Sequence, residues 1–314
     1  MAHHGPPYSP KSKLMIDNSM TKQTPNPMAD RLRILLENDG ILKMPCCFDG
    51  LSSKLVEQAG FDLTFLSGFG ASASRLGAPD TGLMSYGEVL DQVRNAMHPI
   101  SIPMIVDGDT GYGNPMNIVR TVKGFAEAGC AAVMIEDQVA PKRCGHTQDK
   151  SVVDRSEAVE RIHAAVEAQS AHDILIIART DARRSHGLDE ALARAQEFSD
   201  VGADILFVEE PYSIDEMKMI CQTVKGLHLA NMLEGGQTPI LPPADLNEIG
   251  FSIAAYPITL LSAAMKAMNA ALACIAEGEP TEHHILNFAD LRKQIGFDDY
   301  HEKADKLRSR ASAE

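Results

Sequence analysis

Continuous apolar runs recur along the chain between residues 41 and 256, and a glycine or an acid ends or closely follows all but the last of them. Runs without alternation of apolar and polar residues are typical of strands that are covered on both faces. The eight runs are ILKMPC (41–46), LTFLSG (63–68), IPMIVDGD (102–109), AAVMIED (131–137), ILIIARTD (174–181), ILFVEE (205–210), LANMLE (229–234) and FSIAAY (251–256). We therefore expect eight strands of a parallel sheet.

Stretches with helical periodicity separate these runs. They span residues 51–59, 86–97, 117–128, 157–169, 189–201, 214–224, 244–249 and 260–277. Gly60, Gly129 and Gly202 follow three of them closely, as is typical of a left-handed helix cap. Eight strand–helix pairs predict an α/β protein built as a single closed (β/α)8 barrel of the TIM type. A doubly wound sheet is the alternative, but no phosphate-binding glycine fingerprint follows the first run.

The 314 residues suffice for one barrel of about 250 residues. We expect residues 29–280 to form the barrel and residues 281–314 to form a helical tail that makes oligomer contacts. Residues 1–28 are expected to be a disordered or vector-derived extension. This segment lacks the apolar core of a secretory signal and the arginines of an organellar transit peptide.

Charge and cysteine content limit the partners and the compartment. A formal net charge of −14 argues against a nucleic-acid or anionic membrane surface, and we expect no apolar stretch to approach the roughly 18 to 20 residues of a membrane span. The six cysteines show neither CxxC spacing nor the density of a disulfide scaffold. This usage indicates a reducing compartment, and we expect a cytoplasmic protein with a small-molecule ligand.

Carboxylates follow two consecutive apolar runs. Asp107 and Asp109 are two residues apart, so in extended chain they point to the same side, and Glu136 ends the next run. Carboxylates held close together repel one another unless a cation compensates, and oxygen ligands suit Mg2+, with Mn2+ as an alternative. These three residues are therefore the predicted metal ligands. A turn or helix-capping role for the aspartates is the competing interpretation.

A basic loop around Cys144 is the second candidate for chemistry. Lys142, Arg143 and His146 flank this cysteine, and positive neighbours favour a thiolate or ready proton exchange. Cys144, Lys142 and His146 are therefore candidate catalytic residues. A solvated basic loop with an incidental cysteine is the alternative.

Arg179 ends an otherwise apolar run, where a buried charge needs a partner such as a substrate carboxylate. A structural ion pair with Asp181 or Glu209 is the alternative. Polar side chains stand at the ends of most other runs as well, which is where a barrel of this type carries its catalytic groups.

Five ordered motifs resemble those of the isocitrate lyase/phosphoenolpyruvate mutase superfamily. They are SG near the second run, DGDTGYG, EDQ followed by KRCGH, ARTDA and NMLEGGQTP, and the similarity spans residues 30 to 277. The KRCGH loop is similar to that of the lyase branch and differs from the loop of phosphonate mutases and hydrolases. The resemblance implies a carbon–carbon lyase that acts on a 2-oxy acid.

The resemblance also implies roles for individual residues. Asp107 would bind Mg2+ directly, and Asp109 and Glu136 would bind it through water. Cys144 would protonate the departing carbanion, and Arg179 would steady the substrate oxygens. The implied substrate-binding residues are Ser67, Gly68, Phe69, Asp80, Arg179, Glu209, Asn231 and Glu234. The superfamily further implies a homotetramer, a dimer of dimers, in which the final helices swap between paired subunits.

Two departures bear on the substrate. Ser262 stands where methylisocitrate lyases have an arginine that meets a third carboxylate, and Phe65 replaces a tyrosine common in tricarboxylate-cleaving members. A dicarboxylate is therefore favoured, and NMLEGGQTP is similar to the segment in petal-death-type proteins and oxaloacetate hydrolases. The expected reaction is C2–C3 cleavage of an alkylmalate, such as 2,3-dimethylmalate or 2-methylmalate, to a 2-oxo acid and a carboxylic acid. Oxaloacetate hydrolase or decarboxylase, methylisocitrate lyase and a non-catalytic metabolite-binding barrel are the alternatives.

Overall fold

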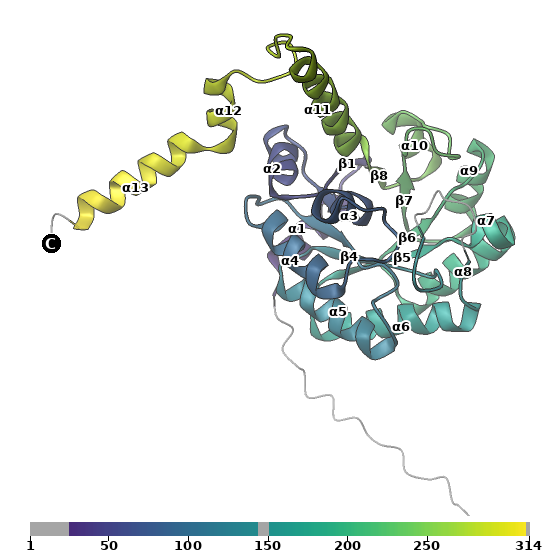
Figure 1. Ribbon diagram of the computed structural model, residues 1–314. Coiled ribbons are helices and arrows are strands. Elements are labelled where there is room, and N and C mark those ends of the chain that lie inside the picture. Colours follow the sequence, from purple (N-terminus) through teal and green to yellow (C-terminus); the bar gives the residue numbers. More distant parts are fainter. Residues whose placement is uncertain (1–24, 144–150, 312–314) are drawn as a thin grey trace, which may run out of the picture.

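The structure, a computed structural model, describes residues 25–143 and 151–311. Its centre is a closed barrel of parallel strands in chain order, and β8 pairs with β1 through Leu42 and Ile253 (Figure 1). The strands are β1 Leu42–Cys47, β2 Thr64–Leu66, β3 Met104–Asp107, β4 Ala132–Glu136, β5 Leu175–Thr180, β6 Ile205–Val208, β7 Leu227–Asn231 and β8 Ile253–Tyr256. The prediction of a (β/α)8 barrel is confirmed.

Helices surround the barrel and connect its strands (Figure 1). They are α2 Gly50–Gln58, α3 Gly68–Leu76, α4 Tyr86–Met97, α5 Pro115–Glu127, α6 Arg155–Ala171, α7 Ala182–His186, α8 Leu188–Val201, α9 Ile214–Thr223 and α10 Pro243–Ile249. The sequence analysis did not predict α3 and α7. Both begin directly after a strand end, where the apolar run dominates the local pattern.

The barrel residues separate into two apolar layers. Side chains such as Ile105 and Ile177 fill the barrel interior, whereas Val106 and Ile176 pack outward against the helices. Successive residues of a strand point to opposite sides, so both sets are buried. This two-sided burial explains why the strands are continuous apolar runs in the sequence.

Helix α1 Pro27–Glu37 packs on the amino ends of the strands. Its Ala29 and Leu32 belong to the interior apolar cluster. Asn26 caps the helix, and its side-chain amide donates a 2.8 Å hydrogen bond to the carbonyl of Cys130. The helix thus begins two residues before residue 29, where the barrel was expected to start. It covers the amino end of the barrel, so the carboxyl ends of the strands form the open end.

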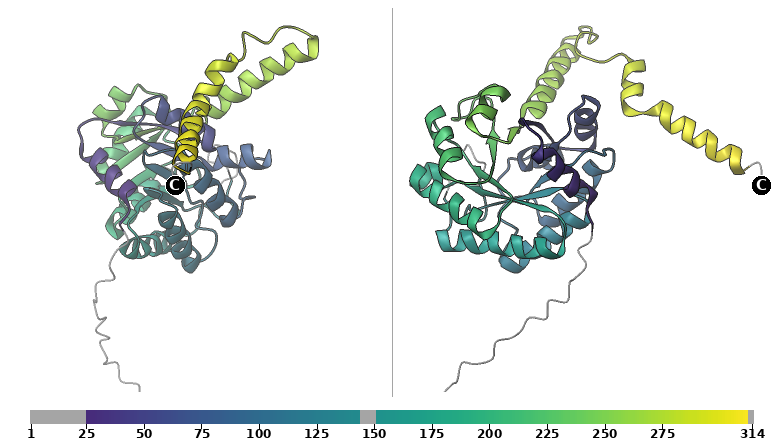
Figure 2. Two further views of the ribbon diagram at one scale, coloured as in Figure 1. Left: turned by 90° about the vertical axis from the view of Figure 1, so that its left-hand side faces the viewer. Right: turned by 180° about the vertical axis from the view of Figure 1, so that it is seen from behind.

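After β8 the chain leaves the barrel. Helices α11 Thr259–Glu277, α12 Phe288–Ile295 and α13 Phe297–Ala311 extend away from it (Figures 1 and 2). Helix α12 returns to α2, where Nζ of Lys54 donates a 2.6 Å hydrogen bond to the carbonyl of Ile295.

Helix α11 exposes most of its apolar side chains. The structure describes all residues of α11, and Leu261 is the one among them that is buried. By length and composition alone this 19-residue helix could cross a membrane. A single such helix among the described residues is weak evidence for a membrane span. The expectation that no apolar stretch reaches that length is therefore wrong for α11.

Candidate active site

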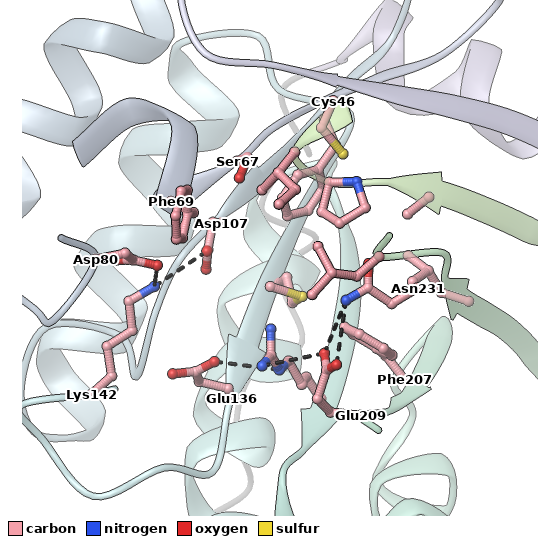
Figure 3. Close-up of a pocket in the computed structure, with 18 of the residues that line it drawn as sticks. Cys46, Ser67, Phe69, Asp80, Asp107, Glu136, Lys142, Phe207, Glu209 and Asn231 are labelled. Atoms are coloured by element: carbon pink, nitrogen blue, oxygen red, sulfur yellow. Dashed lines mark hydrogen bonds and ion pairs between the residues drawn. The ribbon is translucent and has the colours of Figure 1, made fainter. Parts of the chain in front are cut away.

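A cavity of about 260 Å³ opens at the carboxyl ends of the strands (Figure 3). It lies at the end of the barrel where functional groups are expected. The residues singled out from the sequence that line it are Ser67, Phe69, Asp80, Asp107, Glu136, Lys142, Arg179, Glu209 and Asn231. The fold therefore brings side chains from six strand ends and two loops to one place.

Three carboxylates surround the ammonium of Lys142. Its Nζ lies 3.1 Å from Oδ2 of Asp80 and 3.4 Å from Oδ2 of Asp107, and it also pairs with Asp109. The lysine side chain is only 5% exposed. Burial opposes its charge, but Asp107, Asp109 and Asp80 together hold the pKa of Lys142 well above its ordinary value. We call Asp80, Asp107 and Asp109 with Lys142 the acid cluster.

Asp107 and Asp109 also shape the loop after β3. The backbone N–H of Asp109 donates a 3.0 Å hydrogen bond to Oδ1 of Asp107, and Asp109 has φ 50°. Aspartate tolerates this left-handed backbone better than most residues. Asp107 thus stabilises the turn through Oδ1 and belongs to the acid cluster through Oδ2, which pairs with Lys142.

Arg179 connects the carboxylates of neighbouring strands. Its Nε and Nη2 donate to Asp181 at 2.8 and 3.0 Å, and its guanidinium lies 3.4 Å from Glu136 and 3.3 Å from Glu209. The arginine therefore makes a structural ion pair and lines the cavity at the same time. Burial raises the pKa of Glu136 well above its ordinary value, although Arg179 and Lys142 oppose this shift.

One oxygen of Glu136 lacks a partner. Oε1 is buried and accepts no hydrogen bond from the residues that the structure describes, and Glu136 as a whole is 1% exposed. A buried carboxylate oxygen without a donor is costly, so such an atom in a cavity points to a further ligand.

The turn from β2 into α3 places a helix amino end at the cavity. Oγ of Ser67 accepts a 3.2 Å hydrogen bond from the backbone N–H of Gly70 and caps α3. A Cβ at Gly68 would lie 2.5 Å from Oδ2 of Asp107, so this position needs glycine. The first N–H groups of a helix lack intrahelical partners and favour anions.

Asn231 and Glu234 follow β7 but differ in position. The Asn231 amide donates to Glu209 at 3.3 Å and lines the cavity. Glu234 is exposed, does not line the cavity, and accepts a 2.7 Å hydrogen bond from Oγ1 of Thr259. The loop therefore brings Asn231 to the other candidate residues and leaves Glu234 outside.

Cys144 and His146 lie outside the described residues. The chain on both sides of them is held in place, since Gln138 and Val152 form an antiparallel bridge and the N–H of Val139 donates to the carbonyl of Ser151 at 2.9 Å. The backbone N–H of Arg143 donates to Oε1 of Gln138 at 3.0 Å.

Sequence reasoning missed part of the cavity lining. Gln138 was recognised only as part of a motif, and Arg143 only as a neighbour of Cys144. The missed apolar members are Met44, Cys46, Met134, Phe207, Leu229, Leu233, Ala255, Pro257 and Ile258. In the sequence nothing distinguishes these residues from ordinary core residues. Those on β1 and β8 come together only because the barrel closes and makes the two strands neighbours.

The fold and the cavity define a (β/α)8-barrel enzyme with a charged site at the carboxyl ends of its strands. A family model for phosphoenolpyruvate phosphomutase matches residues 32–276. The chain belongs to this family, and the resemblance to the isocitrate lyase/phosphoenolpyruvate mutase superfamily is confirmed.

Individual relatives agree with an enzyme of the lyase type. The chain is 42% identical to 2,3-dimethylmalate lyase of Eubacterium barkeri over 240 residues, which cover 76% of this chain and 83% of that protein. It resembles a structure of oxaloacetate acetylhydrolase in complex with 3,3-difluorooxalacetate, with a TM-score of 0.86, 32% identity and coverage of 90% and 98% of the two chains. A phosphonopyruvate hydrolase solved with oxalate and Mg2+ has a TM-score of 0.78, 27% identity and coverage of 90% and 98%.

Proposed function

We propose that this protein is a Mg2+-dependent lyase that cleaves the C2–C3 bond of an alkylated malate, such as 2,3-dimethylmalate or 2-methylmalate. The products are a 2-oxo acid and a carboxylic acid. The observation that carries this proposal is that Asp80, Asp107 and Lys142 of the acid cluster line one cavity together with Glu136 and Arg179, while Asp109 pairs with Lys142. The 42% identity to 2,3-dimethylmalate lyase supports the choice of substrate.

The donor set fits a hard divalent cation. The acid cluster already gathers three carboxylates around one positive charge, and Oε1 of Glu136 has no partner among the described residues. Among those residues no group of three or more has the spacing of a formed metal site, and the Lys142 ammonium pairs with Asp80, Asp107 and Asp109 instead. Oxygen ligands suit Mg2+ or Mn2+, and a bound cation would supply Lewis acidity at the substrate oxygen.

The protein's own groups bind and orient the substrate. The amino end of α3, from Ser67 to Phe69, receives a carboxylate, and Arg179 and Asn231 hold oxygens on the opposite wall. Cleavage transfers the proton of the C2 hydroxyl to a base or a water molecule in the cavity, turns that hydroxyl into a carbonyl, and leaves the electron pair of the broken C2–C3 bond on C3. Cys144 then donates a proton to C3 as a general acid, and Lys142 and His146 belong to the same catalytic loop.

Oxaloacetate hydrolysis is the second candidate function. It is supported by the similarity to oxaloacetate acetylhydrolase, which was solved in complex with the inhibitor 3,3-difluorooxalacetate. Both reactions break the C2–C3 bond of a four-carbon dicarboxylate backbone. They differ in the products, which are oxalate and acetate in the second case.

A substrate panel with product identification by NMR tests the function. The panel contains 2,3-dimethylmalate, 2-methylmalate, oxaloacetate, methylisocitrate and phosphonopyruvate. We expect the highest kcat/KM for an alkylmalate. Preferred turnover of oxaloacetate to oxalate would favour the second candidate, and turnover of none would refute both.

The proposed assembly is a homotetramer, a dimer of dimers, in which the final helices pack on a partner barrel. Two observations support it. Helices α11 to α13 expose apolar side chains, including Met268, Ile275 and Phe288. An apolar hollow of about 510 Å³ between α2 and α11 is lined by residues such as Leu51 and Leu55.

Sedimentation velocity tests this assembly, and the expected species has four times the mass of the chain. We also place the enzyme in the cytoplasm. This proposal is supported by the cysteines in the described part of the chain, all of which are unpaired.

A further inference from the structure

The described lining of the cavity includes a polar side chain from each of six consecutive strands, and the remaining two strands contribute apolar side chains and a thiol. The polar side chains are Ser67 after β2, Asp107 on β3, Glu136 on β4, Arg179 on β5, Glu209 after β6 and Asn231 on β7. The cavity is lined at β8 and β1 by Ala255, Pro257, Ile258 and Cys46. These two strands are neighbours, with Met44 paired to Ala255, so the apolar side chains form one continuous sector.

Two further side chains border this sector. Phe65 lies on β2 with Cys46 as its register partner, and Leu233 comes from the loop after β7. We call Cys46, Phe65, Leu233, Ala255, Pro257 and Ile258 the alkyl sector. In Figure 3, Cys46 lies across the cavity from Glu136 and Glu209.

The thiol of Cys46 does not make this sector polar. It is 3% exposed, and burial raises its pKa well above the ordinary value, so it stays neutral. A buried neutral cysteine behaves as a small apolar side chain.

The cations that line the cavity stand elsewhere. Lys142 and Arg143 come from the loop after β4, and Arg179 comes from β5. Lys266 on α11 lines a separate groove with Phe69 and Ile258. Within the described part of the chain, the alkyl sector therefore offers a carboxylate no charged partner.

We propose that the alkyl sector is a subsite that binds the alkyl substituent of the substrate. This inference rests on the proposed function and adds the residues that select the substrate. A methyl group there leaves water for an apolar wall, which favours binding about fourfold per carbon. A third carboxylate in the same place would lose its water without gaining a partner, which disfavours tricarboxylates.

The size of Ala255 is central to this proposal. Ala255 has the shortest side chain among the members of the alkyl sector that line the cavity. A leucine at this position would occupy part of the cavity, so substituted ligands would lose more affinity than unsubstituted ones. Cys46→Ser tests polarity at nearly constant volume. Cys47→Ser is the matched control, because Cys47 is equally buried but packs outward against the helices.

Isothermal titration calorimetry in the presence of Mg2+ tests the subsite without turnover. The probes are succinate, 2-methylsuccinate and 2,3-dimethylsuccinate, which lack the hydroxyl group needed for cleavage. We expect each methyl group to tighten binding to the wild-type enzyme about fourfold. Ala255→Leu should abolish this gain, Cys46→Ser should reduce it, and Cys47→Ser should preserve it.

The proposal is overturned if the methylated succinates bind no tighter than succinate. It is also overturned if each methyl group still tightens binding as in the wild type (the methyl gain) in both Ala255→Leu and Cys46→Ser. If Ala255→Leu does not fold, Cys46→Ser and its control still decide the outcome. The turnover panel tests the proposed reaction separately, so a methyl gain without turnover would refute the reaction and leave the subsite standing.

Discussion

Nζ of Lys142 lies 3.1 Å from Oδ2 of Asp80, and it also pairs with Asp107 at the end of β3 and with Asp109 in the loop that follows. The ammonium therefore pairs with the same oxygens that would hold a divalent cation. Lys142 and such a cation would compete for the negative charge of these three carboxylates.

Lys142→Met should accordingly strengthen metal binding. Two unit charges a few ångströms apart interact by about 1 to 4 kcal/mol near a protein surface, so we expect at least a tenfold gain in Mn2+ affinity. Titration by electron paramagnetic resonance without substrate measures it. Lys123→Met is the control, because Lys123 is exposed and pairs with Glu127, at 3.8 Å, outside the acid cluster. An unchanged or weaker affinity in Lys142→Met would contradict competition between lysine and metal.

Cys144→Ser should lower kcat about 100-fold and leave KM within a few-fold, because a serine hydroxyl is a much weaker acid than a thiol and acid catalysis is typically worth this factor. Steady-state kinetics with the preferred substrate of the panel measures the change. Cys221→Ser on α9 is the control, since Cys221 does not line the cavity. A kcat within tenfold of wild type would exclude Cys144 as the proton donor.

Asp137→Ala should destabilise the fold without touching the cavity lining. Asp137 is buried and accepts hydrogen bonds from Oγ1 of Thr180 at 2.7 Å, the N–H of Asp181 at 2.9 Å and Nη1 of Arg194 at 3.1 Å. Its removal leaves buried donors of Thr180, Asp181 and Arg194 without this acceptor, and a buried donor without a partner costs about 1–3 kcal/mol. Urea unfolding measures the loss. The exposed Asp200→Ala should change the free energy of unfolding by less than about 0.5 kcal/mol, and equal losses in both variants would refute the role of Asp137.

The strands and the polar site residues were predictable because each leaves a local signal. A buried parallel strand is an apolar run, and Asp107, Glu136 and Arg179 stand out at the ends of such runs. The alkyl sector leaves no such signal, since Cys46 and Ala255 are ordinary apolar residues until barrel closure makes β1 and β8 neighbours.

The position of Lys142 was also not predictable in detail. The sequence places it beside Cys144 in a basic loop, and it does not reveal that the side chain turns back into the carboxylates after β3. Helix α1 was missed for a related reason. Its two core residues, Ala29 and Leu32, are too few to give a clear apolar period.

The last prediction concerns acid stability. Glu190 on α8 accepts hydrogen bonds from Arg155 and Arg194. These hydrogen bonds, of which that from Arg155 has the largest effect, lower the pKa of Glu190 from 4.5 to about 2. A carboxyl group with a lowered pKa stabilises the fold above its unfolded pKa, and this stabilisation is lost as the pH falls from 4.5 towards 2. Because the pair is largely screened by solvent, its contribution is about 1 kcal/mol.

Glu190→Gln should therefore be about 1 kcal/mol less stable than wild type at pH 7, and the difference should shrink between pH 4.5 and pH 2. Urea unfolding at pH 7, 4.5 and 3.5 measures it. The control is Glu160→Gln, an exposed residue of α6. If the difference between Glu190→Gln and wild type is the same at all three pH values, the ion pair does not couple Glu190 to folding, and the geometry around Arg155 makes no contribution to acid stability.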